Sequence, residues 1–189
     1  MFHGREGEQV AVYDFTLYDD PTNVDAFGAS SHDAEGLATR KNALILDGQL
    51  LTILHNTYTG RRTGFGSTGS AVRGGYTTPP GVGARALILL PGERTPEQIL
   101  ASVGDAFYVQ SVSGLHSGTN PVSGDLSLGA EGLMVRGGEY AEPVREVTIA
   151  STLPRMLLDV ADIGSDLVWL PGGAAGLTLL VGEMAISGV

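Results

Sequence analysis

Residues 125–135, DLSLGAEGLMV, and residues 139–150, EYAEPVREVTIA, decide the fold of this chain. Both runs are rich in apolar and β-branched residues and are bounded by turn residues, a pattern that is typical of β-strands. Gly137-Gly138 lies between them and supplies residues that a tight turn favours. The stretch therefore predicts two strands joined by a turn, in the second half of a chain of 189 residues.

Short strands are expected on both sides of this pair. Asp47-Gly48 lies between two apolar runs and predicts a hairpin with a type I′ turn, because both residues tolerate a positive φ. Residues 21–40 and 64–83 are polar or rich in glycine and proline, and are expected to be loops. The runs that predict further strands are 9–18, 43–46, 49–54, 86–90, 105–112, 167–170 and 177–186.

Helical signals are fewer and shorter. Thr95-Pro96-Glu97-Gln98 combines an N-cap, a proline at the first helical position and a capping-box glutamine, and predicts a helix that ends at Gly104. Residues 55–63 and 152–163 are also expected to be helical. No repeat and no domain linker interrupts the pattern. The sequence thus predicts a mainly β protein with short helices (α+β), with mixed or antiparallel sheets in one domain over residues 1–189.

The composition argues against several classes of partner. The chain has 21 acidic and 11 basic residues, a formal charge of −10, and Lys41 is its only lysine. Nucleic acids and anionic membranes require clustered basic side chains, so neither is expected as a partner. No apolar run approaches the length of a membrane span, and the start does not resemble a signal peptide. There is no cysteine. We expect a cytoplasmic protein.

Several motifs have ordinary structural interpretations. Residues 64–69 match G-x-G-x-x-G, but neither an apolar strand before them nor a helix after them is expected, so a dinucleotide site is not predicted. The carboxylate groups Asp19/Asp20, Asp33/Glu35 and Asp159/Asp162/Asp166 are interpreted as turn residues or solvated faces. No two histidines lie at a helical spacing, so the chain lacks the minimal box of a zinc hydrolase.

The loop at residues 114–125 is the densest polar segment and has two interpretations. Its glycines and polar side chains are suited to presenting hydrogen-bonding groups to an extended peptide. Alternatively, it is a shaped connection in which Asn120 and Asp125 satisfy their own turns. Composition alone does not favour either interpretation.

This loop also carries a resemblance to a known family. Residues 118–132, GTNPVSGDLSLGAEG, resemble a block of the TldD/PmbA family that typically reads G-x-N-x-V-[ST]-G-D-[FY]-S-x-G-A-x-G. The resemblance covers nearly the whole chain, in order. The other similar blocks are 17–21, 33–36, 56–62, 79–83, 137–139, 143–144, 148–153 and 163–166.

The resemblance implies the C-terminal domain of a TldD/PmbA subunit. Members of the family, also called modulators of DNA gyrase, pair as a heterodimeric metalloprotease (peptidase) implicated in peptide maturation. In the TldD-type subunit, a helical His-Glu-x-x-x-His box and a cysteine hold zinc. Here the first residues resemble the block after that helix, and residues 172–176, GGAAG, stand where the cysteine would be. No metal ligand or catalytic residue is transferred to this chain, and a PmbA (TldE)-type subunit is expected.

Three hypotheses for function follow. The favoured one is the C-terminal part of a PmbA/TldE-like subunit of a zinc-dependent peptidase complex, which contributes a peptide cleft and a dimer interface and is inactive alone. The alternatives are a stand-alone binding or scaffold module that completes a split TldD-type metalloprotease, and an unrelated hydrolase. The resemblance implies a TldD-type subunit or a second copy as partner, with zinc held by the TldD-type partner. The residues expected to bind an extended peptide are Gly114, His116, Asn120, Gly124 and Asp125.

Overall fold

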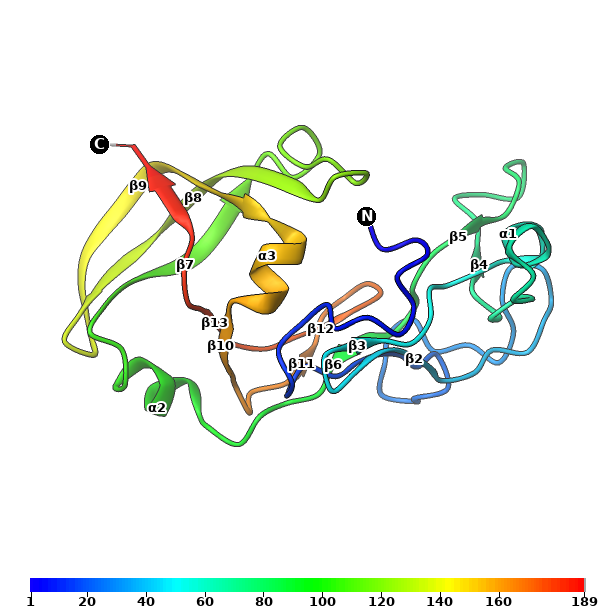
Figure 1. Cartoon of the computed structure of the whole chain (residues 1–189), viewed down its shortest axis with the longest axis horizontal. Coiled ribbons are helices and arrows are strands. Elements are labelled where there is room, and N and C mark those ends of the chain that lie inside the picture. Colours follow the sequence, from blue (N-terminus) through cyan, green and yellow to red (C-terminus); the bar gives the residue numbers. More distant parts are fainter. Residues whose placement is uncertain (189) are drawn as a thin grey trace. The chain divides into compact units, whose positions relative to one another are not determined.

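The computed structural model describes residues 1–188, which form two compact units. Unit 1 comprises Met1, Pro91–Asp166 and the residues from Thr178, whereas unit 2 comprises Phe2–Leu90 and Leu167–Leu177. Strands and short helices build both units (Figure 1). Within residues 1–188 the strands pair antiparallel, and parallel pairing is confined to isolated bridges. The predicted mainly β fold is confirmed.

The central sheet of unit 1 is built on the predicted hairpin. Its strand order is β14-β9-β8-β7, and the β8–β9 pair runs from Arg136↔Glu139 at the turn to Asp125↔Thr152 at the far end. Gly137 and Gly138 have φ values of 58° and 82°, as a tight turn requires. The strands are β7 (Asp105–Ser113), β8 (Asp125–Arg136), β9 (Glu139–Thr152) and β14 (Ala185–Ser187).

A small apolar core lies against one face of this sheet. Its buried residues alternate along two neighbouring strands, as side chains with a period of two must do to reach one face. They are Leu128, Ala130, Val147 and Ile149, with Phe107, Leu126, Val144 and Met184 packed around them.

The helices and the second ladder of unit 1 follow in short pieces. Helix α2 (Pro96–Leu100) begins at Thr95 with the predicted capping box. The prediction of a helix over 152–163 is confirmed only for α3 (Leu153–Leu158) and is wrong for the residues after it. These form β10 (Val160–Ile163), which pairs with β13 (Leu179–Val181). Val160 and Ile163 are buried in that ladder, so tertiary pairing overrides the helical pattern.

Unit 2 contains a sheet with the order β3-β2-β1-β6. The predicted Asp47-Gly48 turn is confirmed, since these residues have φ values of 48° and 78°. Residues 64–83 are a loop apart from the β4–β5 ladder. The elements are β1 (Leu17–Asp19), β2 (Asn42–Leu46), β3 (Gln49–Leu50), α1 (Thr57–Thr63), β4 (Ala71–Val72), β5 (Gly81–Val82), β6 (Leu87–Leu89), β11 (Val168–Trp169) and β12 (Ala175–Gly176).

Several predicted strands are shorter than expected or divided. The strand at 9–18 is reduced to β1, because the N–H groups of Val10 and Ala11 both donate to the Gly48 carbonyl instead of to a ladder. The strand at 49–54 ends at Leu50, and the run 177–186 divides into two strands around Gly182 and Glu183. None of the helices in residues 1–188 is long and apolar enough to cross a membrane.

The core of unit 1 predicts a large effect of truncation at Ile149. This side chain is 7% exposed, whereas its cross-strand neighbour Ile186 is 52% exposed. We expect Ile149→Ala to lower the free energy of unfolding by about 2–4 kcal/mol and Ile186→Ala by less than about 1 kcal/mol. Urea denaturation followed by circular dichroism measures both. Equal effects would contradict the assigned core.

Asp166 and Thr178 predict a pH-dependent contribution to stability. Partial burial raises the pKa of Asp166, but hydrogen bonds from the Thr178 backbone N–H (3.0 Å) and hydroxyl (2.8 Å) outweigh it and hold the pKa below its ordinary value. A lowered folded-state pKa contributes stability above the unfolded-state pKa, and that stability is lost as the pH falls through the folded-state value.

We therefore expect Asp166→Asn to destabilise the protein by about 1 kcal/mol at about pH 7 and to have a smaller effect in acid. Thermal melts of the two proteins from about pH 3, below the ordinary pKa of an aspartate, to about pH 7 test this. A difference that grows toward low pH would contradict a lowered pKa of Asp166 in the folded state.

Candidate functional site

The loop between β7 and β8 consists of two turns. The first begins at Gly114, whose carbonyl accepts from the N–H groups of Ser117 (3.0 Å) and Gly118 (2.7 Å). In the second, Gly124 N–H donates to the Asn120 carbonyl and Asn120 N–H donates to the Asp125 carbonyl, both at 2.8 Å. The loop therefore has a defined shape that its own backbone maintains.

The predicted site residues divide between these turns. Asn120, Gly124 and Asp125 come together in the second turn, whereas Gly114 and His116 belong to the first. The His116 side chain is exposed and has no hydrogen-bond partner among residues 1–188. Gly124 is buried with a φ of 86°, and an added Cβ would lie 2.4 Å from Met1 Sδ. Packing therefore requires glycine at position 124.

Asn120 and Asp125 satisfy their own turns, as the second interpretation of this loop expected. Asn120 Oδ1 accepts from the N–H groups of Val122 (2.9 Å) and Ser123 (3.3 Å), and the Asp125 carboxylate accepts from the Ser123 hydroxyl (2.6 Å). Asn120 Nδ2 has no acceptor within residues 1–188 and is exposed. The Nδ2 group of Asn120 is therefore free to donate to a ligand.

The loop also lengthens the edge of the sheet. Thr119 bridges Leu126, and Ser127 N–H donates to the Gly118 carbonyl at 2.7 Å. Because β9 occupies the other side of Leu126, these residues lie on the β7 side of β8. A Cβ on Gly118 would lie 2.1 Å from the Ser127 carbonyl oxygen, so only glycine permits this approach. Residues 118–120 thus continue the line of β7.

Strand β7 is an outer strand of the sheet and is unpaired along one side within the described residues. It has 9 residues and pairs with β8 alone within the described chain, and most of its residues are exposed. A singly paired strand presents a row of free N–H and C=O groups that can pair with another extended chain. The opposite edge, β14, has only 3 residues.

Three neighbouring strands of the sheet are distorted side by side, at the same position along their length. The register shifts near Gln110 in β7 and near Glu131 in β8, and Glu146 in β9 has a φ of 57°. A Cβ on Gly132 would lie 1.9 Å from the Tyr108 carbonyl oxygen, so the strands approach closely there. Bulges of this kind bend a sheet and redirect side chains. The shift near Gln110 divides the pairing of β7 with β8 into two regular segments.

The carboxylates of unit 2 have structural roles, as the sequence indicated. Asp19 Oδ1 accepts from the N–H groups of Arg85 (2.9 Å) and Ala86 (2.8 Å). Asp33 accepts from three backbone N–H groups, including that of Ala71 at 3.1 Å, and Glu35 accepts from Thr57. In unit 1, Asp159 and Asp162 do not share a helical face, because Asp162 lies in β10.

The residues present do not fit a zinc site. Within residues 1–188, no three histidine, cysteine, aspartate or glutamate side chains gather closely enough to hold a metal ion. No step of a metal-dependent reaction is therefore assigned to these side chains.

Comparison with known proteins defines the class of protein to which this fold and edge belong. The family model of the PmbA/TldA metallopeptidase C-terminal domain matches residues 1–188. The chain therefore belongs to the PmbA/TldA metallopeptidase family, as its motifs predicted.

Individual relatives agree with this assignment. The chain is 31% identical to the metalloprotease PmbA of Escherichia coli over 182 residues (96% of this chain, 38% of the relative), and 29% identical to a metalloprotease of Methanothermobacter thermautotrophicus over 185 residues (97% and 40%). The structure of TldE from Thermococcus kodakarensis superposes with a TM-score of 0.91 at 25% identity, covering 99% of this chain and 42% of that one. A Thermotoga maritima protein described as a modulator of DNA gyrase gives 0.90 at 29% identity (98% and 42%). The chain thus spans about two fifths of the length of these relatives.

Sequence reasoning indicated the loop and the strand before it, but not that one side of this strand is free. The run 105–112 is recognisable as a strand, but only the sheet order shows that one of its sides is free. The absence of a strand that returns along β7 is a property of the topology, which local patterns do not encode.

The Asn120 turn yields a prediction with a matched control. Asn120→Ala removes the acceptor of the Val122 and Ser123 N–H groups, whereas Asn120→Asp retains an oxygen in the same place. We expect the alanine variant to lose about 1 kcal/mol of stability and to exchange these two amide hydrogens faster. Amide exchange followed by NMR measures this. Identical exchange in both variants would show that the side chain does not maintain the loop.

Proposed function

We propose that this chain is the part of a PmbA/TldE-like subunit that binds an extended peptide in a zinc-dependent peptidase complex, without contributing metal ligands. The observation that carries the proposal is the free edge of β7, lengthened by residues 118–120. A peptide that pairs with this edge gains main-chain hydrogen bonds that require no particular side chains. Such binding is suited to a protein that handles peptides of varied sequence.

In this proposal the first turn of the loop borders the bound peptide. Gly114 and His116 lie directly after β7, and the amide of Asn120 lies where the edge continues. Asn120 Nδ2 would donate to a peptide carbonyl, and His116 would contact a peptide side chain. A TldD-type partner would provide the hydrolytic metal centre. In the same proposal, this chain contributes part of the interface with that partner. The dimeric state and the cytoplasmic location stay predictions.

Two measurements test the proposal. We expect the purified chain to bind an extended peptide but not to hydrolyse it, and hydrolysis to require an added TldD-type subunit with zinc. Peptide binding is measured by fluorescence anisotropy, with a control peptide that has the same sequence and N-methyl groups on alternate residues. The control should bind at least about tenfold more weakly, because it lacks the donors that pair with β7.

Three results would contradict the proposal. Equal binding of the N-methylated peptide would exclude strand addition. Binding unaffected by both Asn120→Ala and His116→Ala would remove the loop from the site. Zinc-dependent hydrolysis by the purified chain alone would show that it holds its own catalytic centre.

A further inference from the structure

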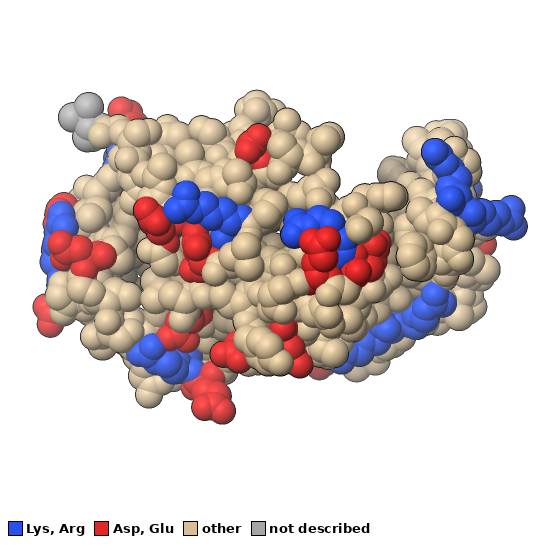
Figure 2. Space-filling view, in the orientation of Figure 1, with Lys and Arg blue, Asp and Glu red and all other residues tan. Residues whose placement is uncertain are grey.

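The two units differ sharply in charge. Unit 1 contains 12 acidic and 4 basic side chains, a formal charge of −8, whereas unit 2 contains 9 acidic and 7 basic ones, a formal charge of −2. The chain's net charge of −10 therefore comes mostly from the unit that contains β7. Both signs are visible on the face in Figure 2, and several basic side chains lie directly beside acidic ones.

Ion pairs already neutralise most of the basic side chains in unit 1. Arg94 pairs with Asp162, Arg136 with Asp105 (3.1 Å) and Glu142 (2.9 Å), and Arg155 with Asp159 (3.2 Å) and Glu183 (2.9 Å). Within residues 1–188, Arg145 is the basic residue of unit 1 that has no ion pair. Carboxylates without a basic partner include Glu93, Glu97, Asp125, Glu131, Glu139 and Glu146.

Two tyrosines form an open aromatic surface on the same sheet. Tyr108 in β7 and Tyr140 in β9 have ring centroids 5.1 Å apart and an interplanar angle of 56°. Their residues are 40% and 51% exposed, respectively. Exposed tyrosine faces attract ammonium and guanidinium groups, because the ring face carries partial negative charge.

Helix α2 brings a carboxylate to this surface. Partial burial, the Tyr108 hydroxyl and the Glu97 carboxylate, in that order, raise the pKa of Tyr140. Hydrogen bonding from its own backbone N–H and from the Thr95 side chain lowers the pKa of Glu97, so its carboxylate is ionised at neutral pH. The Glu97 carboxylate therefore acts electrostatically on Tyr140.

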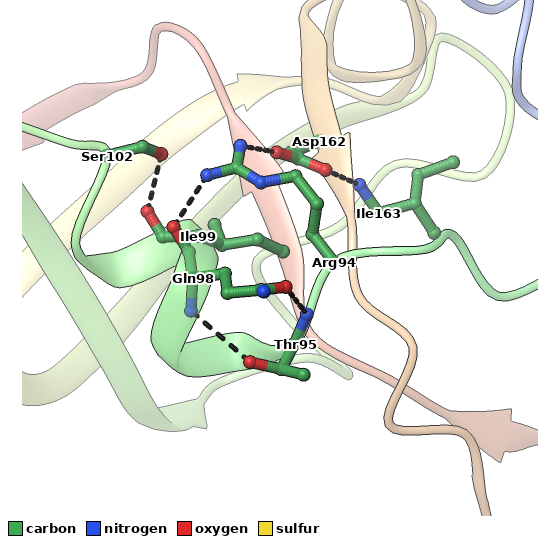
Figure 3. Close-up of polar contacts among 7 residues, drawn as sticks. All are labelled: Arg94, Thr95, Gln98, Ile99, Ser102, Asp162 and Ile163. Carbon is green, nitrogen blue, oxygen red and sulfur yellow. Dashed lines mark hydrogen bonds and ion pairs between the residues drawn. The ribbon is translucent and has the colours of Figure 1, made fainter.

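The position of α2 is fixed from both ends. Figure 3 shows the Arg94 guanidinium bonded to the Asp162 carboxylate and to the Gln98 carbonyl (2.6 Å), and the Thr95–Gln98 capping box beside it. A Cβ on Gly138 would lie 3.0 Å from Ala101 Cα, so the β8–β9 turn packs closely on the end of the helix. Glu97 lies one helical turn before Ala101, and Tyr140 lies two residues after Gly138, so these contacts place the helix face that carries Glu97 against the turn next to Tyr140.

We propose that the β7 edge selects cationic extended peptides, with a lysine or arginine side chain of the peptide seated on Tyr108 and Tyr140 beside Glu97. The inference rests on the proposed function and adds to it the chemical class of the peptide. The charge of unit 1 also argues against a second copy as the occupant of this edge, because two units of charge −8 would repel each other.

The test uses three capped extended peptides of about eight residues, which differ only in carrying two lysines, two glutamines or two glutamates. We expect the lysine peptide to bind about fivefold more tightly than the glutamine peptide in about 20 mM NaCl, and the glutamate peptide to bind most weakly. In about 0.5 M NaCl the differences should fall below about twofold. Equal affinities at low salt would overturn the inference.

Matched variants test which side chains cause the preference for the lysine peptide. Tyr108→Leu and Glu97→Gln should each reduce the lysine-to-glutamine affinity ratio by about twofold to threefold, whereas Tyr108→Phe should preserve it because the ring remains. Unchanged binding of the glutamine peptide shows that a variant is folded. A Tyr108→Leu protein with the full lysine preference would overturn the assignment to the tyrosines.

The outcomes separate this inference from the proposed function. Equal binding of all three peptides, with loss of binding on N-methylation, would remove the charge preference and leave strand addition intact. Absence of binding by all three would contradict both.

Discussion

The pairing of β8 with β9 is the interaction on which unit 1 depends. These strands have 12 and 14 residues, and the turn at Gly137-Gly138 makes them neighbours in sequence as well as in space. The apolar side chains of the core lie on these two strands, and the turn itself contacts α2. Once the hairpin forms, β7 and β14 are left as the two edges, and only β7 is long enough to pair with a peptide of several residues.

Local signals made much of this fold predictable. The Asp47-Gly48 turn, the capping box at Thr95 and the 125–150 hairpin each depend on neighbouring residues, and the structure confirms all three. The wrong predictions concern segments that long-range contacts decide. Residues 9–16 bond to the Gly48 carbonyl and to other parts of the Asp47-Gly48 hairpin, and residues 160–163 leave a helical pattern to pair with β13.

The candidate site was only partly predictable, for the same reason. The sequence indicated Gly114, His116, Asn120, Gly124 and Asp125, and the structure gives Gly124 a packing role and Asp125 a role within the turn. The free side of β7 and the pair of Tyr108 with Tyr140 depend on strand order and register. Membership of the PmbA/TldA metallopeptidase family follows from the motifs, whereas the proposed peptide-binding edge follows from the topology.

Hydrogen exchange along β7, with and without a bound peptide, is the most direct test of the central claim. Main-chain pairing should slow the exchange of alternate β7 amides, those whose N–H groups point away from β8, and leave β14 unchanged. The same measurement on residues 118–120 would show whether the edge extends into the loop. Slowed exchange confined to β14, or no change in β7 at saturating peptide, would contradict the account.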